Sequence, residues 1–383
     1  MAHIYKVLNG YATSNGTKKY HDYAVQKGKP STHFRLFDGL YLSSIGIGTY
    51  LGKPNEQDDK DMENAIIESI RSGAVNVIDT AINYRAMKSE KCIGRALSYL
   101  IREDIITRDQ IFICTKNGYI TNDGDYPGID VMEYIQNMFI SNGIIESKDI
   151  SSGYNVLNPN YIARCIDKSL MNMHLDTIDL VYIHNAFESW YNDVNREQFF
   201  EMLSKVFETD ERYRSNNKIR YYGMATWTCF RVHKDSKEYL SLEQVVNLAQ
   251  QVGGANHGFK FIQLPYNLAY SEALLLKNQS VGLEKNLSIL EAADKLNVKV
   301  FASIPLFQKR LLKSNIPNYM GLNDQVAKLI QIIRSSPSII APLIGYKKQE
   351  HVEQNIKIAN IPPLNDKDFT DAISILLKEN LLH

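Results

Sequence analysis

Short, nearly continuous apolar runs recur along the chain, and longer segments with helical spacing of apolar residues lie between them. Continuous apolar runs, rather than alternating ones, are typical of parallel strands that are covered on both faces of a sheet. The pattern predicts strands at Tyr41–Thr49, Val75–Thr80, Ile111–Lys116, Ile178–His184, Tyr221–Thr226, Phe261–Tyr266, Val298–Ile304 and Ile339–Ile344.

Amphipathic segments separate several of these runs. In Asp61–Arg71 the residues that share one helical face are Met62, Ala65, Ile66, Ser69 and Ile70. Comparable spacing predicts further helices at Ser89–Arg102, Asn160–Met173, Asn286–Leu296 and Asp324–Arg334. Strands that alternate with helices predict an α/β fold with a parallel sheet, either closed as a barrel or open and doubly wound. Periodicity does not separate these two folds.

Three segments depart from this alternation. Residues 1–33 are polar and are predicted to be an N-terminal extension that covers one end of the fold. Phe34–Leu42 predicts a β-hairpin around a tight turn at Asp38-Gly39. Residues 119–158 form a long insertion after the third predicted strand, where long loops commonly shape a site. Because no linker divides the rest, residues 34–383 are expected to form a single domain.

Composition narrows the classes of protein to consider. Lys plus Arg equals Asp plus Glu at 43 each, and this balance disfavours nucleic-acid and anionic-membrane binding. The four cysteines form no CxxC pair and no cluster with zinc spacing, so we expect free thiols and no metal. The first residues lack the apolar run of a signal peptide, and no stretch approaches the roughly 18 apolar residues of a membrane helix. A cytoplasmic location is therefore expected.

Ionisable residues follow three successive predicted strands. Asp79 lies at the end of the second strand, with Tyr84 just beyond it, and Lys116 and His184 end the third and fourth strands. In a barrel the carboxyl ends of the strands converge on one face, where catalytic groups gather. Although each residue alone has an ordinary structural explanation, the four could therefore meet in space.

Together these side chains suit acid–base chemistry on a carbonyl group. A phenol has a reference pKa of about 10. An ammonium group nearby lowers that pKa, and a carboxylate can hold the ammonium in place. The hypothesis is that Tyr84 donates a proton, that Lys116 lowers the pKa of Tyr84 toward neutral pH, and that Asp79 holds Lys116. His184 would orient the carbonyl oxygen.

The sequence resembles the aldo-keto reductase superfamily. The segments that carry the resemblance are VNVIDTAINY, IFICTK, DLVYIH, IQLPYN, FASIPL and PLIGYKKQEHVEQNI, which follow the family's order over roughly residues 34–360. The resemblance implies a single-domain (β/α)8 TIM barrel and hydride transfer between a nicotinamide and a carbonyl. It also implies that Asp79, Tyr84, Lys116 and His184 form the catalytic tetrad.

The resemblance further implies a nicotinamide cofactor at the mouth of the barrel. Gln263 matches the residue that holds the carboxamide, and Asn355 matches the asparagine that contacts adenine. Lys347 and Lys348 are expected to bind a 2′-phosphate, so NADP(H) is preferred and NAD(H) remains possible, although a solvated charged face explains these lysines nearly as well. The expected cofactor contacts are Gly48, Thr49, Tyr50, Asp79, Ala225, Thr226, Gln263, Ser303, Pro305, Leu306, Gly345, Lys347, Lys348, His351 and Asn355.

Some positions depart from the family's pattern. Ala225 and Thr226 stand where the family has serine and asparagine, Ser303 stands in place of an aromatic residue, and His351 in place of an arginine. These changes weaken the expected contacts with the cofactor and indicate a divergent subfamily. The predicted function is NADP(H)-dependent reduction of a small aldehyde or ketone, or the reverse, with Tyr84 as general acid. The alternatives are a cofactor-binding regulatory protein with little turnover, and a lyase or epimerase on the same barrel.

Overall fold

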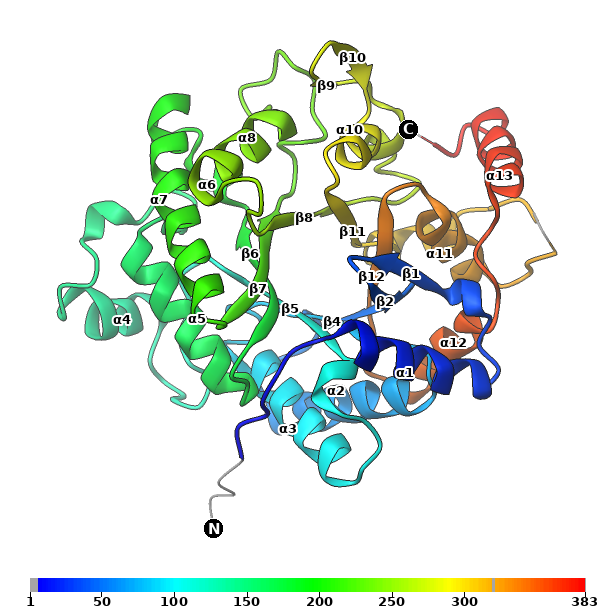
Figure 1. Ribbon diagram of the computed structural model, residues 1–383, viewed down its shortest axis with the longest axis horizontal. Coiled ribbons are helices and arrows are strands. Elements are labelled where there is room, and N and C mark those ends of the chain that lie inside the picture. The colour runs from blue at the N-terminus through cyan, green and yellow to red at the C-terminus, as the bar shows by residue number, and fades with distance from the viewer. Residues whose placement is uncertain (1–5, 319–320, 383) are drawn as a thin grey trace.

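The computed structural model describes residues 6–318 and 321–382, and within them eight parallel strands close into a barrel (Figure 1). The barrel strands are β3 (Gly46–Gly48), β4 (Val77–Asp79), β5 (Phe112–Asn117), β6 (Ile178–His184), β7 (Ile219–Ala225), β8 (Phe259–Pro265), β11 (Lys299–Ser303) and β12 (Ile339–Gly345). They are joined in chain order, and β12 pairs with β3 to close the ring. The fold is therefore a (β/α)8 barrel and not an open doubly wound sheet.

Helices surround the barrel (Figure 1). The longer ones that follow barrel strands are α2 (Glu56–Arg71), α3 (Lys88–Arg102), α5 (Pro159–Met173), α7 (Arg196–Ser215), α8 (Leu242–Gly253), α10 (Ile289–Lys295), α11 (Gln325–Ser335) and α12 (Gln349–Ala359), and α13 (Asp366–Lys378) packs against α11. Shorter elements are α4 (Val131–Ile135), α6 (Ala186–Trp190), α9 (Glu272–Leu275), and the hairpin of β9 (Gln279–Val281) and β10 (Glu284–Leu287). The predicted helices are confirmed, apart from small shifts at their ends and the start of α10.

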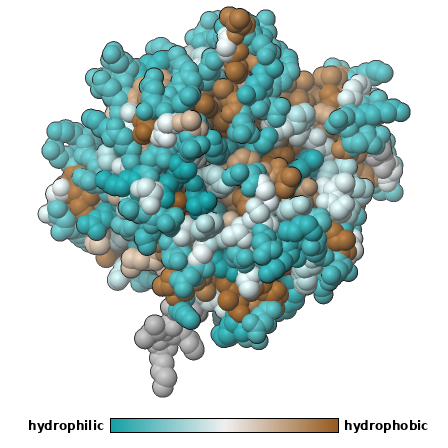
Figure 2. All heavy atoms as spheres, viewed as in Figure 1, coloured by the Kyte–Doolittle hydropathy of each residue, from teal (hydrophilic) through white to brown (hydrophobic). Residues whose placement is uncertain are grey.

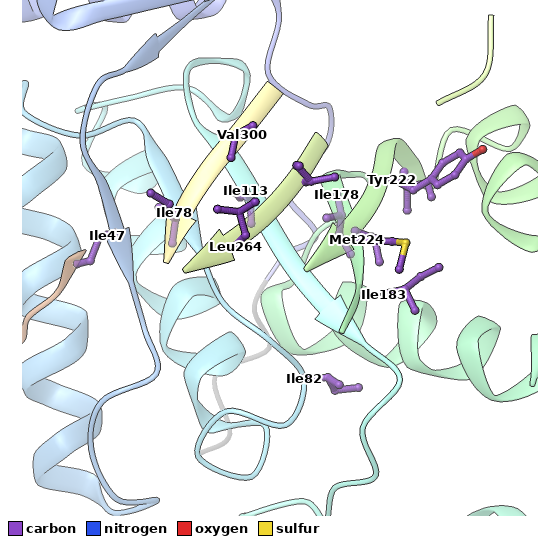
Figure 3. Packing of buried hydrophobic residues seen from close by; sticks show 14 of the residues in the cluster. Ile47, Ile78, Ile82, Ile113, Ile178, Ile183, Tyr222, Met224, Leu264 and Val300 are labelled. Atoms are coloured by element: carbon purple, nitrogen blue, oxygen red, sulfur yellow. The ribbon is translucent and has the colours of Figure 1, made fainter. Parts of the chain in front are cut away.

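Alternate residues along each strand face two separate cores. Residues such as Ile78, Ile113 and Leu264 face outward and belong to the larger apolar cluster shared with the helices (Figure 3). The second cluster fills the inside of the barrel and includes Phe112 and Phe261. A TIM barrel is filled by side chains in this way, so its interior is a packed core and not a pore.

The predicted hairpin closes one end of the barrel. It consists of β1 (Phe34–Phe37) and β2 (Leu40–Ser43), and both Asp38 and Gly39 of its turn have positive φ, as a tight two-residue hairpin requires. Phe37 packs at 4.6 Å, between ring centroids, from Phe261, which lies near the start of β8. The hairpin therefore seals the end at which the strands begin and leaves the opposite end for a site.

The predicted extension at residues 1–33 contains a helix that the sequence pattern did not reveal. Residues 1–5 lie outside the described part, and α1 (Ser14–Gln26) follows them, with Thr13 as its N-cap. The buried Tyr20 hydroxyl lies 2.8 and 2.7 Å from the carbonyl oxygens of Ile70 and Val75. Because α1 also packs against β2, it supports the hairpin at the sealed end.

Two predicted boundaries are wrong. The predicted strand Tyr41–Thr49 is two strands, because the chain turns after Ser43, leaves the antiparallel hairpin and enters the parallel barrel at Gly46. The predicted helix Asn286–Leu296 begins only at Ile289, because Ser288 and Glu291 form a capping box and the preceding residues belong to β10.

Backbone hydrogen bonds join the first and last residues of the predicted insertion at residues 119–158, next to the end of β5. Ile120 N–H donates to Tyr154 O at 3.0 Å, and Val156 N–H donates to Gly118 O at 2.8 Å. Since β5 ends at Asn117, these bonds hold both ends of the insertion beside the open mouth. Its inner part contains α4 and a short π-helical turn.

The surface and the cysteines do not point to a particular ligand or partner. The face in Figure 2 is mostly hydrophilic with separate hydrophobic patches, one over the β9–β10 hairpin, where Leu283 is 98% exposed. All four cysteines are buried as free thiols, as the sequence predicted. Of the helices in the described ranges, none combines the length and apolar character needed to cross a membrane. The cytoplasmic location stays a prediction.

A buried histidine joins the hairpin to the barrel and makes stability depend on pH. His33 is fully buried, with its Nε2 2.8 Å from Ala74 O and its Nδ1 3.0 Å from Ser44 Oγ. Burial, with Arg334 nearby, lowers its pKa to about 3. A lowered histidine pKa means that this contribution to stability is complete above the unfolded pKa of about 6.5 and is lost as pH falls toward 3.

We therefore expect the stability advantage of the wild type over His33→Gln to shrink below pH 6.5, by about 1.4 kcal/mol per pH unit. Urea unfolding at pH 7 and pH 5 measures this difference. His233→Gln, at an exposed histidine, serves as the control and should show no such change. If the wild type exceeds His33→Gln in stability by the same amount at both pH values, the lowered pKa of His33 is contradicted.

Candidate active site

Barrel closure brings the predicted tetrad to one mouth. Asp79 is the last residue of β4, Lys116 lies one residue before the end of β5, and His184 ends β6. The parallel register aligns these ends, with Asp79 opposite Cys114 on β5. Tyr84 lies on the loop that follows β4. The four residues meet at the end opposite the hairpin, as the sequence predicted.

A buried ion pair between Lys116 and Asp79 lies at the bottom of this mouth, which we call its floor. Lys116 Nζ lies 2.6 Å from Asp79 Oδ2 and also donates to Thr80 O at 2.7 Å. The Lys116 side chain is fully buried. Burial alone would lower the pKa of Lys116, but Asp79 and Tyr84 outweigh burial and raise it. Lys116 is therefore an ammonium ion at neutral pH.

Gln263 completes the floor from β8. Its Nε2 donates to Asp79 Oδ1 at 2.9 Å, so both carboxylate oxygens of Asp79 are bonded. The sequence predicted that Gln263 binds the cofactor carboxamide. In this structure its amide lies at the same mouth, beside the ion pair, and one of its hydrogen-bonding groups is already used by Asp79.

The ring of Tyr84 lies over the ion pair. Lys116 Nζ is 4.7 Å from the ring centroid, and the ring of Tyr50 meets that of Tyr84 edge-on at 5.1 Å. Burial raises the pKa of Tyr84 above 10, Lys116 lowers it, and Asp79 raises it, with a net increase. The expected fall toward neutral pH is therefore wrong, because desolvation outweighs the ammonium. The phenol is protonated at neutral pH and can donate a proton.

His184 stands beside the phenol as a neutral ring. Its centroid is 6.0 Å from that of Tyr84 and 5.0 Å from that of Tyr119. Burial and Lys116 lower its pKa well below 6.5. Its Nδ1 is buried and has no hydrogen-bond partner among the described residues. The ring is therefore uncharged and has a nitrogen available for another hydrogen bond.

Residues at the base of the insertion support His184, and the sequence did not indicate them. Asn155 Nδ2 donates to His184 O at 2.9 Å, and Trp190 Nε1 donates to Asn155 Oδ1 at 3.3 Å. Asn185 Nδ2 donates to the hydroxyl of Tyr119 at 3.2 Å. No local motif marks Asn155 or Tyr119, because their positions depend on how the insertion folds back.

The predicted nicotinamide contacts surround the same mouth. Thr49 is buried, and both its N–H and its hydroxyl donate to Asp79 O at 3.1 Å. Ala225 ends β7 opposite His184 and Gln263. Thr226 is buried, and its hydroxyl lies 3.4 Å from Gln263 O. The Thr226 side chain therefore bonds to the main chain in the place where the family's asparagine stands.

The remaining predicted contacts lie on the ends of the last strands. Gly48 pairs with both Asp79 and Gly345, so the loops after β3, β4 and β12 are neighbours. Ser303 ends β11 opposite Pro265 on β8. Pro305 and Leu306 follow Ser303 in the loop that leads to an irregular 3₁₀ segment at Phe307–Lys313.

At the predicted adenosine end, the two lysines differ. Lys347 forms an ion pair with Asp58 of α2, a partner that the sequence did not indicate. Lys348 is the exposed N-cap residue of α12, and His351 lies in the first turn of that helix. Asn355 is buried, its Nδ2 donates to His351 O at 2.7 Å, and its Oδ1 has no partner in the described chain.

Comparison with known proteins places the chain in a family. The sequence profile described as Aldo/keto reductase family matches residues 44–328, which is most of the chain. The chain belongs to the aldo/keto reductase family. The family is one of oxidoreductase enzymes. In the described residues, no group of three or more His, Cys, Asp or Glu side chains could hold a metal ion.

Individual aldo/keto reductase relatives are distant. The chain is 28% identical over 191 residues to the NADH-specific methylglyoxal reductase of Escherichia coli (strain K12), covering 49% of each protein. The first three curated relatives are matched over only about half of their length. An oxidoreductase of Bacillus subtilis (strain 168), YqkF, is 20% identical over 86% of this chain and 91% of its own.

A solved structure supports the same fold. The aldo-keto reductase from Klebsiella pneumoniae in complex with NADPH matches with a TM-score of 0.55. The match covers 90% of this chain and 94% of that chain at 17% identity. At that identity the likeness shows the barrel fold and nothing about ligands.

In this aldo/keto reductase, loss of the buried ion pair between Lys116 and Asp79 should greatly reduce the free energy of unfolding. Lys116→Met would leave Asp79 buried without its cation, and breaking a buried pair costs about 3–5 kcal/mol. Adding Asp79→Asn should recover part of that loss. Lys18→Met, in an exposed pair with Asp22, is the control and should cost little. Urea unfolding gives the comparison, and similar losses for both lysines would contradict the prediction.

Proposed function

We propose that the protein is an NADP(H)-dependent aldo/keto reductase that reduces a small aldehyde or ketone to an alcohol, or catalyses the reverse. The observation that carries this proposal is the contact of Lys116 with both Asp79 and the ring of Tyr84 at the open mouth. A proton donor, a buried cation and a neutral imidazole are the groups that carbonyl reduction needs around the oxygen atom.

The residues present fit a nicotinamide dinucleotide along the mouth. The buried Oδ1 of Asn355 has no partner among the described residues, so it can accept a hydrogen bond from an adenine amino group. The exposed Lys348 stands at the N-terminus of α12, where a cation and the helix dipole both favour a phosphate. Gln263 lies beside the tetrad for the carboxamide. When bound, the nicotinamide supplies the hydride that passes to the carbonyl carbon.

The tetrad then has separate roles. Tyr84 is protonated at neutral pH and donates its proton to the carbonyl oxygen as that oxygen gains negative charge. The ammonium of Lys116 stabilises the phenolate that remains. Asp79 holds Lys116 in position. The neutral ring of His184 hydrogen-bonds the substrate oxygen and orients it toward Tyr84.

The cofactor preference rests on the charges near α12. Lys348 is the cation that we assign to the 2′-phosphate, because Lys347 is paired with Asp58. Asp58 also places a carboxylate at this end of the site. In other dinucleotide sites an acidic residue near the ribose favours NAD(H). NAD(H) is therefore the alternative cofactor, and the Escherichia coli relative is named as NADH-specific.

A second function is favoured by one observation. Ala225 has no polar side chain, and the hydroxyl of Thr226 faces the carbonyl of Gln263, so the carboxamide has fewer partners than in the family's pattern. A cofactor-binding regulatory protein with little turnover would tolerate such a loss. Turnover measurements separate this function from catalysis.

The first test concerns Tyr84. Purified protein with NADPH and a panel of aldehydes should lose absorbance at the nicotinamide band. Tyr84→Phe should slow that loss by about 10²–10⁴-fold, because the proton donor is removed. Tyr99→Phe, on the outer helix α3, is the matched control. Tight NADPH binding without turnover in the wild type would instead favour the regulatory function.

The second test concerns the phosphate. Lys348→Ala should weaken NADPH binding by about tenfold or more, the worth of a charge-assisted hydrogen bond, and leave NADH binding unchanged. Asp58→Asn should tighten NADPH binding by releasing Lys347. Fluorescence titration measures both, with Lys357→Ala near the other end of α12 as control. Equal affinity of the wild type for NADPH and NADH would show that the phosphate assignment is wrong.

A further inference from the structure

The turn that follows Tyr84 has an unfavourable backbone conformation. Arg85, Ala86 and Met87 have φ values of 52°, 51° and 67°, which is the left-handed region. Residues with a Cβ rarely adopt this region, and they remain there only when the surroundings hold them. The residue proposed as proton donor is therefore attached directly to a segment that needs external support.

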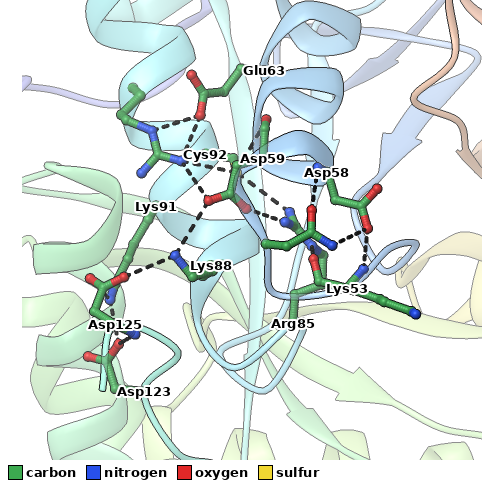
Figure 4. A network of polar contacts seen from close by, with 12 residues as sticks. Lys53, Asp58, Asp59, Glu63, Arg85, Lys88, Lys91, Cys92, Asp123 and Asp125 are labelled. Carbon is green, nitrogen blue, oxygen red and sulfur yellow. Dashed lines mark hydrogen bonds and ion pairs between the residues drawn. The ribbon is translucent and has the colours of Figure 1, made fainter. Parts of the chain in front are cut away.

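Arg85 provides that support through every nitrogen of its guanidinium group (Figure 4). Nε donates to Lys53 O at 3.0 Å, Nη1 lies 3.6 Å from Cys92 Sγ, and Nη2 forms an ion pair with Asp59. The Arg85 side chain is only 1% exposed. It therefore fastens the Tyr84 loop to the loop after β3, to α2 and to α3 at once.

Asp59 is the anion on which this arrangement depends. Its Oδ2 lies 3.5 Å from both Lys88 Nζ and Arg95 Nη2, so cations approach it from three residues. Burial raises the pKa of Cys92 to about 12, which makes that neighbour a neutral thiol. Without Asp59, the buried guanidinium of Arg85 would lose its ion-pair partner.

The insertion also contacts this turn. Gly124 N–H donates to Ala86 O at 2.9 Å. Lys91 of α3 lies 2.5 Å from both Asp123 and Asp125 of the insertion. A Cβ on Gly124 would lie 3.0 Å from Ala86 O, so the two backbones are close. The turn is therefore held between α2, α3 and the insertion.

We propose that Arg85, anchored by Asp59, is a positioning residue that holds Tyr84 against Lys116. The proposal rests on the proposed function, because it takes Tyr84 as the proton donor. The ring of Tyr84 is 4.7 Å from Lys116 Nζ, and a charge acts on a phenol more weakly as their separation grows. Relaxation of the turn would move the ring away from the ammonium without removing any reacting group.

The kinetic test compares Arg85→Gln, Arg85→Lys and the wild type. Arg102→Gln is the control, since Arg102 lies on α3 in an exposed ion pair with Glu103. We expect Arg85→Gln to lower kcat by about 10- to 100-fold, as small misplacements of reacting groups do. Arg85→Lys keeps the positive charge but loses the branched guanidinium group, so its kcat should lie between those of Arg85→Gln and the wild type. If Arg85→Gln does not fold, Arg85→Lys is compared with the wild type and with Arg102→Gln instead.

A double-variant comparison separates positioning from general damage. If Arg85 acts through Tyr84, Arg85→Gln should cause little further loss of kcat in a Tyr84→Phe background. A purely structural role would lower activity by the same factor in both backgrounds, and that result would overturn the proposal. So would a kcat of Arg85→Gln equal to that of Arg102→Gln.

A readout without turnover keeps this proposal distinct from the proposed function. The protein is labelled with 3-fluorotyrosine, whose phenol ionises at lower pH than that of tyrosine. The ¹⁹F signal of Tyr84 is assigned by its absence in Tyr84→Phe. We expect its titration to shift in Arg85→Gln relative to the wild type and Arg102→Gln, because a displaced ring changes both its burial, which raises the phenol pKa, and its distance from Lys116, which lowers that pKa. Identical titrations would overturn the proposal even if the wild type proves catalytically inactive.

Discussion

The ion pair between Lys116 and Asp79 is the interaction on which the mouth of this barrel depends. Two charges leave water here, and their burial is tolerated because Thr80 O and Gln263 satisfy the remaining hydrogen bonds. The side chains of Lys116 and Asp79 are almost fully buried, so little solvent reaches the pair. The exclusion of water matters for the proposed function, because the field of Lys116 is weakly screened there and reaches the ring of Tyr84.

The direction of the Tyr84 shift changes how the tetrad is understood. The sequence suggested that Lys116 lowers the phenol pKa toward neutrality, but burial and Asp79 together outweigh that effect. In the proposed reaction Tyr84 would therefore begin protonated, and the ammonium would act mainly once the proton has left and a phenolate remains. Residue types alone cannot reveal this balance, since it depends on how deeply the ring is buried.

Features with a local pattern were predictable, and those that depend on distant contacts were not. Barrel strands are continuous apolar runs, so most of their positions and the tetrad at their ends could be predicted. The split at Ser43, where a hairpin strand gives way to a barrel strand, lies within one apolar run and leaves no local signal. The pairing of Lys347 with Asp58 and the contact of Tyr119 with His184 join residues far apart in the chain.

Strand ends and loop residues are held to the mouth by different means. Asp79, Lys116 and His184 are fixed by the barrel itself, whereas Tyr84 lies on a loop with no strand of its own. Loops open locally at lower free energy than a core does, so a reacting group on a loop needs additional contacts to keep its geometry. The left-handed turn after Tyr84 increases this need, because it would relax if released. The buried cation of Arg85, fastened to three separate elements, is the kind of contact that such a loop requires.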